Sequence, residues 1–495
     1  MAQSTTLAEH FAALATADPE APAITCAGSS ETRRQLEQRA NRLARAYQQL
    51  GVTPNSFVTI GLPNTVQFLE AAIAAWKCGA TPQPVSFRLP ARERRAIIEL
   101  AEPSLVVGVA SEDAEGYPAI PAGYEPGPGL SDAPLGEVAA ASWKAPTSGG
   151  STGRPKLIVS TQAALVESVE PFARLLGMTD GDTVLITGPL YHNAPFLLSA
   201  CALVLGGHVV LMPRFEAESA LQLVQEHAVD YLYAVPTMMG RIWRLPEEQR
   251  LSFDVSSLRV VMHMAAPCPP WLKQAWIDWL GPERVWELYA ATEVQAVTIL
   301  TGSEWLAHPG TVGRPVVGEM RVLDPAGAPL PAGEVGEIWM RRGPGVPNPY
   351  RYLGAEPRTM GDGWESVGDM GCIDAEGYVC LADRKSDMLI VGGANVYPAE
   401  VEGALSEHPM VRTGVVIALP HDDLGQVPHA LLELEGEVTD EELRAHLAER
   451  LASYKIPRSF ERVSEPLRDD AGKVRRVALA AERATVTENS SEQVR

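Results

Sequence analysis

The sequence lacks the features of an exported or membrane-spanning protein. No apolar run reaches the roughly 18 residues that cross a bilayer as a helix, so we expect no membrane insertion. Residues 1–20 do not show a basic segment followed by an apolar segment and a cleavage site. They have the pattern of an amphipathic helix instead. We therefore expect a cytoplasmic protein.

Cysteine is scarce and scattered along the chain. There are six cysteines among 495 residues, with no CxxC pair and no histidine at metal-ligand spacing near them. This pattern is typical of small apolar core residues in a reducing compartment, and it argues against a disulfide framework or a structural zinc site.

Positive charge is also in short supply. Lysine and arginine number 41 against 62 aspartates and glutamates, which gives a formal net charge of −21 at pH 7. A broad surface for nucleic acid or an anionic membrane needs concentrated positive potential, so we expect neither partner. Any phosphate-bearing ligand must be held locally, where glycines, backbone N–H groups and single basic side chains converge.

The chain is long and contains many apolar residues. It has 495 residues, of which 46% are hydrophobic and 21% charged, and this favours a globular protein of two or more domains. From about residue 20 to 380, short β-branched runs such as 57–62, 183–188 and 208–212 alternate with longer helical stretches such as 65–79. Strands that alternate with helices predict a layered α/β fold with much parallel pairing.

The character of the sequence changes near Asp383. A compact segment with its own helices and strands follows, in which Thr439 and Glu442 form a capping-box pattern at the start of a helix. We therefore predict a large N-terminal layered α/β domain over residues 1–383 and a small C-terminal α+β domain over residues 384–495.

The most informative segment is TSGGSTGRPK at 147–156, which is followed directly by an apolar run. Glycines let the backbone approach phosphate oxygens, hydroxyls donate hydrogen bonds, and a lysine adds charge. The segment is not a Walker A loop, because GK[ST] is absent and a strand is expected to follow it. Taken alone, it also fits a flexible Gly/Ser linker. The candidate phosphate ligands are Ser148, Gly149, Gly150, Ser151, Thr152, Gly153 and Lys156.

Four further motifs follow this loop in order: WELYAATE at 286–293, SVGDMG at 366–371, DRKSDMLIVGGANVYPAEVE at 383–402 and AGKVRR at 471–476. Together the five segments resemble the signature motifs of the adenylate-forming superfamily, which includes acyl-CoA synthetases, luciferases and the adenylation domains of peptide synthetases. The resemblance covers nearly the whole chain.

Three other segments narrow the resemblance within that superfamily. PLYHNAPF at 189–196, AAPCPPWLK at 265–273 and EWLAHPGTVGRP at 304–315 resemble acyl-CoA ligases that act on bile-acid-like and other bulky acids. Such an enzyme joins a carboxylic acid to AMP, releases pyrophosphate, and then passes the acyl group to the thiol of coenzyme A. The resemblance thus implies a bulky acid, ATP and coenzyme A as substrates and Mg²⁺ as a cofactor. A homodimer is the default expectation.

The resemblance also implies roles for single residues. Thr292 matches a threonine that contacts the α-phosphate, and Glu293 matches the glutamate that helps to bind Mg²⁺. Asp369 matches the acid that binds the ribose hydroxyls, and Arg384 matches an arginine that contacts the ribose or a phosphate. Lys473 matches the lysine that bridges the acid carboxylate and the α-phosphate during adenylation.

The family carries out its two half-reactions in two orientations of a mobile C-terminal domain, which pivots near the position of Ser386. Gly392, Gly393 and Asn395 then lie in the loop that approaches the pantetheine arm of coenzyme A, where small residues permit close contact. Taken alone, these three residues also fit a plain hairpin turn.

His192 matches an aromatic or histidine position beside the acyl carboxylate. The acyl pocket is expected to draw on further residues, although methionine and phenylalanine are more often plain core residues. These are Asn193, Phe196, Met238, Met239, Met264 and Ala265.

Three positions depart from the commonest family pattern. Gly149 stands where serine is frequent, Ala290 replaces a glycine in the nucleotide site, and Ser386 occupies a pivot position that is usually charged. A methyl group at Ala290 crowds the nucleotide or requires a positive φ. An enzyme that only converts a preformed adenylate into a thioester therefore stays an alternative. Acyl transfer to a carrier protein's phosphopantetheine and a non-catalytic protein on the same scaffold are two others.

Overall fold

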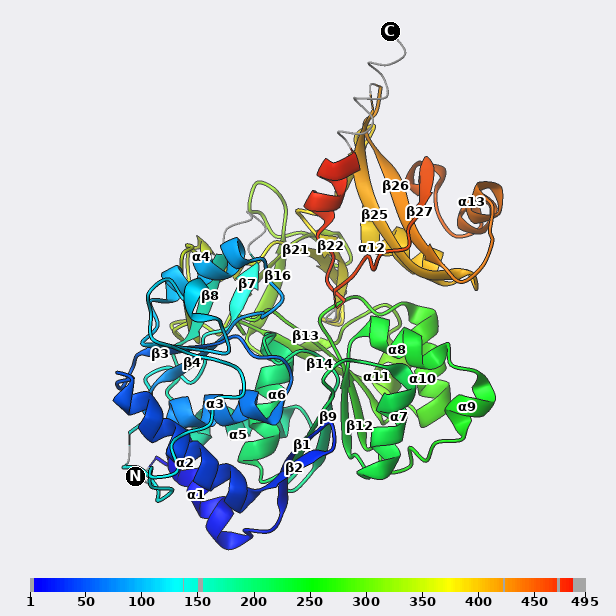
Figure 1. The fold of residues 1–495 in the computed structure, drawn as a ribbon. Helices are drawn as coiled ribbons and strands as arrows, with labels where there is room; N and C mark the ends of the chain where they lie inside the picture. Colours follow the sequence, from blue (N-terminus) through cyan, green and yellow to red (C-terminus); the bar gives the residue numbers. More distant parts are fainter. Residues whose placement is uncertain (1–3, 137, 150–154, 422, 470–471, 484–495) are drawn as a thin grey trace.

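The structure is a computed structural model and describes residues 4–136, 138–149, 155–421, 423–469 and 472–483 (Figure 1). These residues form a large body and a smaller C-terminal unit, and their strands make five sheets. The combination of a large α/β part with a C-terminal α+β part confirms the predicted fold class. In the described residues, no helix combines the length and apolar character needed to cross a bilayer.

The largest sheet has nine strands in the order β15-β14-β13-β12-β11-β9-β10-β1-β2. Pairing is parallel from β13 to β1 and antiparallel at both edges. The sequence-predicted strands at 183–188 and 208–212 lie in its centre, where apolar residues on both faces suit a sheet covered on both sides. The strands are β1 (Pro22–Cys26), β2 (Ser29–Thr32), β9 (Thr183–Ile186), β10 (His208–Leu211), β11 (Tyr231–Ala234), β12 (Val260–His263), β13 (Val285–Ala290), β14 (Val297–Thr301) and β15 (Arg314–Val317).

Helices connect these strands and supply the rest of the packing. The connecting helices are α5 (Val166–Leu175), α6 (Asn193–Val204), α7 (Ala217–Glu226), α8 (Pro236–Trp243), α9 (Glu247–Leu251), α10 (Pro270–Leu280) and α11 (Gly302–Ala307). α6 is apolar around its whole circumference and almost fully buried, as expected for a helix inside a layered core.

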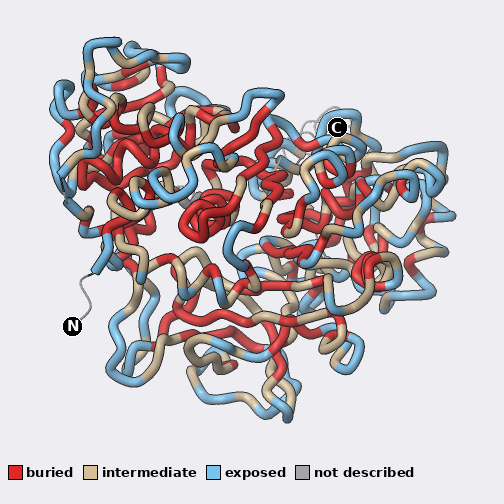
Figure 2. The backbone as a smooth tube through the Cα atoms, turned by 90° about the horizontal axis from the view of Figure 1, so that it is seen from below, coloured by how far each residue is buried: buried red, intermediate tan, exposed pale blue. Residues whose placement is uncertain are grey.

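A second, parallel sheet is built from β3 (Phe57–Ile60), β4 (Thr81–Pro84), β5 (Leu105–Val107) and β6 (Ala119–Ile120). Helix α3 (Val66–Lys77) contacts strands of both this sheet and the nine-stranded one, and nearly all of its residues are buried. Figure 2 shows buried backbone concentrated in the interior of this body. The helices α1 (Leu7–Ala17), α2 (Arg33–Gln49) and α4 (Ala91–Ala101) and the short turn η1 (Ser111–Asp113) complete the layer.

Two antiparallel sheets complete the large body. One pairs β7 (Thr147–Gly149), β8 (Pro155–Ser160) and β18 (Tyr350–Leu353), so a strand follows the glycine-rich loop, as predicted. The other contains β16 (Glu319–Leu323), β17 (Gly336–Arg341), β19 (Arg358–Met360), β20 (Trp364–Ser366), β21 (Asp369–Ile373) and β22 (Val379–Arg384).

The C-terminal unit has a hydrophobic core of its own, which includes Leu389, Val401, Leu432 and Leu443. Its capping box is formed as predicted, because Glu442 N donates to Thr439 Oγ1 and Thr439 N donates to Glu442 Oε2. The elements are β23 (Leu389–Val391), β24 (Ala394–Val396), α12 (Pro398–Ser406), β25 (Val411–His421), β26 (Gly425–Leu434), α13 (Asp440–Ala448), η2 (Ser453–Lys455) and β27 (Ser459–Arg462).

A buried carboxylate with a half-buried carboxylate beside it makes the stability of the large body depend on pH. Glu70 of α3 is 1% exposed, it lies beside Glu31, and it forms an ion pair with Arg39. Burial, reinforced by the charge of Glu31, raises the pKa of Glu70 from 4.5 to about 8. Between these two values the folded chain holds a proton that the unfolded chain releases, so stability is lost as pH rises through this window.

We expect the Glu70→Gln substitution to remove much of that loss, because glutamine does not titrate. Urea unfolding at a pH below 4.5, near neutrality and above 8 measures the effect. The wild-type midpoint is expected to fall more steeply with pH than the midpoint of the variant. Parallel pH profiles for the two proteins would contradict the assignment.

Candidate active site

The site begins with Glu293, which follows the end of β13 and is 5% exposed. The Lys156 ammonium of β8 donates to Glu293 Oε1 at 3.0 Å, and the Tyr352 hydroxyl donates to the same oxygen. Lys156 also lies over the Tyr352 ring, 4.0 Å from its centroid. A lysine from the glycine-rich segment and the glutamate of the WELYAATE motif are therefore brought together across the fold. Thr292 precedes Glu293 and is partly exposed.

The backbone beside Glu293 is strained. Val294 has φ of +56°, a left-handed conformation that a β-branched side chain rarely adopts. Strain of this kind persists where the surrounding structure imposes it, and it concentrates at functional sites. Ala290, in contrast, ends β13 as an ordinary strand residue and has no positive φ, so the backbone difficulty anticipated for an alanine here is absent.

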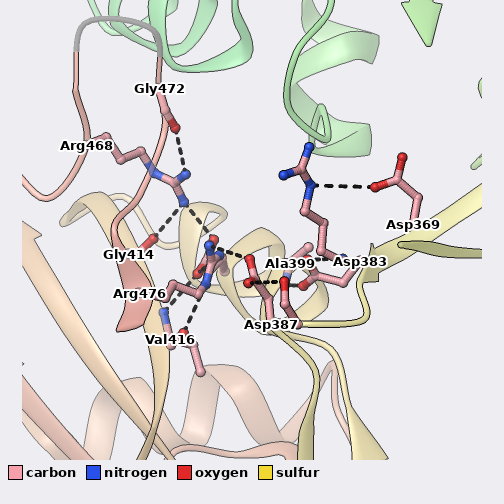
Figure 3. Close-up of polar contacts among 12 residues, drawn as sticks. Asp369, Asp383, Asp387, Ala399, Gly414, Val416, Arg468, Gly472 and Arg476 are labelled. Atoms are coloured by element: carbon pink, nitrogen blue, oxygen red, sulfur yellow. Dashed lines mark hydrogen bonds and ion pairs between the residues drawn. The ribbon is translucent and has the colours of Figure 1, made fainter. Parts of the chain in front are cut away.

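Asp369 opens β21 and lies opposite Arg384, the last residue of β22 (Figure 3). The Tyr289 hydroxyl donates to Asp369 Oδ2 at 2.8 Å, and Arg384 Nε lies 3.5 Å from Oδ1. Burial raises the pKa of Asp369, and Arg384 and Tyr289 oppose this rise. Tyr289 and Arg384 thus set the orientation of a carboxylate that is only 14% exposed.

The loop that carries Lys473 lies against the large body. A Cβ atom placed on Gly472, which has φ of +75°, would lie 3.0 Å from Thr237 Oγ1 at the start of α8. Lys473 N donates to Asp469 Oδ1, and Asp469 N donates to the Lys473 carbonyl. These bonds join the described residues on the two sides of positions 470–471, and Gly472 lies at the surface of α8.

Arginines of the C-terminal unit bind groups close to Lys473 (Figure 3). Arg468 donates to the Gly472 carbonyl at 3.1 Å and to Glu402 of α12 at 2.6 Å. Arg476 donates to the other oxygen of Glu402, also at 2.6 Å. Glu402 is thus a shared anchor for the chain on both sides of Lys473.

Lys473 and His192 approach each other from different parts of the chain. Burial, to which the positive charge of Lys473 adds, lowers the pKa of His192 to about 3, so the imidazole is neutral at pH 7. Desolvation lowers the pKa of Lys473; Asp469 opposes this, and Arg384 adds to it. His192 Nε2 is buried and has no hydrogen-bond partner among the described residues. The imidazole is therefore positioned to take a polar ligand.

The residues predicted for the acyl pocket fall into two groups. Asn193 begins α6 directly after His192 and is partly exposed, and Ala265 is exposed with φ of +74°. Phe196, Met238 and Met239 are almost completely buried in the main core, and Met264 is 7% exposed. A place in an acyl pocket stays a prediction for all six residues.

Some predicted residues lie elsewhere or outside the described chain. Gly392 and Gly393 form the turn between β23 and β24 with φ of +55° and +87°, and Asn395 follows in β24. No contact recorded among the described residues joins these three to Lys473. Ser148 and Gly149 belong to β7, while Gly150, Ser151, Thr152 and Gly153 lie outside the described residues.

Three side chains of the site were missed by sequence reasoning. Tyr289 lies within WELYAATE, and Tyr352 comes from a distant strand, so only the fold reveals that they bind Asp369 and Glu293. Lys144 is 7% exposed and donates to Asn193 Oδ1 at 2.5 Å, and burial lowers its pKa to about 7. A lysine in an apolar stretch before the glycine-rich loop was the available signal.

Comparison with known proteins agrees with this arrangement. A family model described as AMP-binding enzyme matches residues 11–142 and 144–351, and a model described as AMP-binding enzyme C-terminal domain matches residues 400–473. A feruloyl-CoA synthase from Amycolatopsis sp. is 32% identical over 90% of this chain and 92% of its own length. A 2-succinylbenzoate–CoA ligase from Bacillus licheniformis is 30% identical over 90% of this chain and 93% of its own length.

A solved structure extends the similarity to the fold. The o-succinylbenzoate CoA synthetase from Bacillus subtilis, in complex with an acyl-adenylate intermediate, superposes with a TM-score of 0.82 at 26% identity and covers 96% of this chain and 98% of that one. The resemblance to adenylate-forming enzymes is therefore confirmed. The chain belongs to the AMP-binding enzyme family.

Proposed function

We propose that the protein is an AMP-forming acid–thiol ligase, which converts a carboxylic acid into an acyl-adenylate with ATP and then transfers the acyl group to coenzyme A. The observation that carries this proposal is the contact of the Lys473 segment with the large body, where a Cβ atom on Gly472 would lie 3.0 Å from Thr237 Oγ1 of α8. Relatives named as acid–CoA ligases and a similar fold that binds an acyl-adenylate support both half-reactions. They do not favour an enzyme limited to thioester formation.

The nucleotide site binds the ribose through a carboxylate and the phosphates through basic and hydroxyl groups. Asp369 presents two oxygens that suit the two adjacent hydroxyls of a ribose, and Arg384 lies beside it for the ribose or a phosphate. Thr292 contacts the α-phosphate. Lys156 and the glycine-rich segment hold the β- and γ-phosphates, since Lys156 is free to exchange Glu293 for a phosphate.

Glu293 fits a role in binding Mg²⁺. Its carboxylate is buried, is held from two sides and offers the hard oxygen donors that this ion prefers. Bound Mg²⁺ would neutralise charge on the phosphates. The Tyr352 hydroxyl orients Glu293 for this purpose, because it fixes one carboxylate oxygen after Lys156 has moved to a phosphate.

Lys473 supplies positive charge where it is needed in adenylation. When the acid carboxylate attacks the α-phosphate, negative charge accumulates on the phosphate oxygens, and a lysine aimed there stabilises the transition state. The neutral imidazole of His192 lies close to Lys473 and orients the acid carboxylate by a hydrogen bond. The acid lies between α6 and the strand ends, with Asn193, Met264 and Ala265 nearest the exposed side.

A second orientation of the C-terminal unit accounts for the thiol step. Polar contacts between the two units include Trp271 Nε1 to Ser406 Oγ at 3.0 Å and Arg244 to the Val411 carbonyl at 2.9 Å. Such contacts are easily exchanged. Rotation about Ser386, which follows β22, then withdraws Lys473 and brings the turn at Gly393 towards the acyl group.

The acid is proposed to be a bulky one, of aryl or alicyclic type. The relatives named for ferulic and succinylbenzoic acids support this class. A panel of aryl, alicyclic and short-chain acids, incubated with ATP, Mg²⁺ and coenzyme A, tests the proposal by the consumption of free thiol and the formation of AMP. AMP formation that requires an added carrier protein would favour the carrier alternative instead.

We also propose a cytoplasmic homodimer with no nucleic-acid or membrane partner. The net charge of −21 argues against an anionic partner, and the six free cysteines suit a reducing compartment. The homodimer is the default for an enzyme of this kind. Size-exclusion chromatography with light scattering tests the oligomeric state.

Removal of the Tyr289 hydroxyl is expected to weaken nucleotide binding. In Tyr289→Phe, Asp369 loses the donor that orients it, and the KM for ATP is expected to rise roughly tenfold, with little change in the KM for the acid. Tyr231→Phe is a matched control, because the buried Tyr231 hydroxyl has no hydrogen-bond partner among the described residues. A rise in both KM values to the same extent would point to a general disturbance and contradict this role.

A further inference from the structure

Two cysteines face each other on one hairpin of the large body. Cys372 of β21 and Cys380 of β22 are direct partners in the antiparallel register. Residues paired in this way have Cα atoms about 4.5–5.5 Å apart, which falls inside the range of about 4.4–6.8 Å that a disulfide spans. The backbone spacing of this pair therefore permits a disulfide between them.

These two thiols differ from most of the other cysteines. Both are free and partly exposed, whereas Cys26, Cys78 and Cys201 are buried. A small thiol or disulfide reagent can therefore reach the pair from solvent.

The hairpin of β21 and β22 lies between the nucleotide site and the C-terminal unit. Its open end carries the opposed pair Asp369 and Arg384, and the chain passes from Arg384 directly to Ser386. Its strands approach so closely that a Cβ atom on Gly371 would collide with the Cys380 carbonyl. A bond between Cys372 and Cys380 would act on the segment that joins the nucleotide site to the C-terminal unit.

We propose that Cys372 and Cys380 are a reversible redox site, which forms an intramolecular disulfide by exchange with a low-molecular-weight disulfide such as oxidised glutathione. In the first step the thiolate of one cysteine attacks the reagent and releases one glutathione thiolate. In the second step the other cysteine attacks the resulting mixed disulfide and releases the second glutathione. The protein loses two electrons and two protons, and one oxidised glutathione becomes two reduced molecules.

The surroundings make the exchange depend on pH. Burial raises the pKa of the Cys380 thiol to about 12. Because the thiolate is the nucleophile in exchange, we expect the disulfide to form faster as pH rises.

The disulfide has a regulatory consequence, which rests on the proposed function. Cross-linking stiffens the hairpin next to the pivot, so the oxidised protein is expected to keep adenylation and to lose most of its transfer to coenzyme A. Reduction with dithiothreitol restores the transfer. Intracellular disulfides are commonly of this transient, redox-sensing kind.

Mass spectrometry of the full chain tests the site without reference to activity. After treatment with oxidised glutathione, the wild-type protein should lose two hydrogens, and digestion should yield one peptide pair joined through Cys372 and Cys380. Cys380→Ser should instead retain one glutathione on Cys372, and Cys268→Ser should behave as wild type. A wild-type protein that stays fully reduced, or that links other cysteines, would overturn the proposal.

An activity measurement tests separately whether the Cys372–Cys380 disulfide changes acyl transfer. Pyrophosphate exchange and acyl-CoA formation are measured on the oxidised and the reduced protein, with Cys380→Ser as the variant that cannot close the bond. A disulfide that forms without any change in transfer would overturn the regulatory role and leave the site standing. If the reduced protein forms no acyl-CoA at all, the proposed function fails, while the mass result still decides the redox site.

Discussion

Replacement of Lys473 by alanine is expected to lower the rate of acyl-adenylate formation by roughly 10²–10³-fold, the typical cost of removing one group that stabilises developing negative charge. Lys473 follows Gly472, which lies against Thr237 of the large body, and its charge acts on His192. Exchange of labelled pyrophosphate into ATP, in the presence of the acid and without coenzyme A, measures this step alone.

The Lys473 variant should retain the second half-reaction. Supplied with synthetic acyl-adenylate and coenzyme A, it is expected to form acyl-CoA at close to the wild-type rate, because the lysine is withdrawn in that orientation. Lys455→Ala is a suitable control, since Lys455 lies in the same unit and pairs with Glu400 at 2.6 Å. Undiminished pyrophosphate exchange by the Lys473 variant would show that the assigned role is wrong.

Substitution of Gly393 by leucine is expected to impair acyl transfer to coenzyme A and to spare adenylation, which is the reverse of the effect expected for the Lys473 variant. Gly393 has φ of +87° at the tip of the β23–β24 turn, where a bulky residue is strained and blocks close approach of the pantetheine arm. Displacement of the reacting thiol by about 1 Å costs roughly 10²-fold in rate, so acyl-CoA formation should fall by about that factor. Pyrophosphate exchange should continue.

A matched substitution controls for backbone strain. Gly333→Leu places the same side chain at a φ of +85° on the large body, also with open space around the Cβ position. Both half-reactions should proceed in that variant. Equal loss of adenylation and transfer in Gly393→Leu would mean that the substitution disturbs folding and has no specific effect on the thiol step.

Much of the fold could be predicted because local patterns determine it. The β-branched runs at 183–188 and 208–212 form buried parallel strands, and the residues after the glycine-rich segment form β8. The capping box of Thr439 and Glu442 depends on residues three apart, so the sequence alone specifies it. These features require no knowledge of distant contacts.

The partners within the site depend on tertiary structure and were not predictable in the same way. Tyr352 reaches Glu293 only because β18 pairs with β8, and their separation along the chain gives no hint of this contact. Cys372 and Cys380 resembled scattered core cysteines until the register of β21 and β22 placed them opposite each other. Ala290 shows the reverse case, because a backbone difficulty inferred from one substitution is absent in the strand that forms.

Direct measurement of both half-reactions on one purified chain tests the central claim. An aryl or alicyclic acid, ATP and Mg²⁺ are incubated first without coenzyme A, and coenzyme A is added after pyrophosphate release has been followed. We expect acid-dependent pyrophosphate release with enzyme-bound acyl-adenylate, followed by acyl-CoA and AMP when the thiol is added. Transfer from synthetic acyl-adenylate without any acid-dependent pyrophosphate release, across the whole acid panel, would contradict the account.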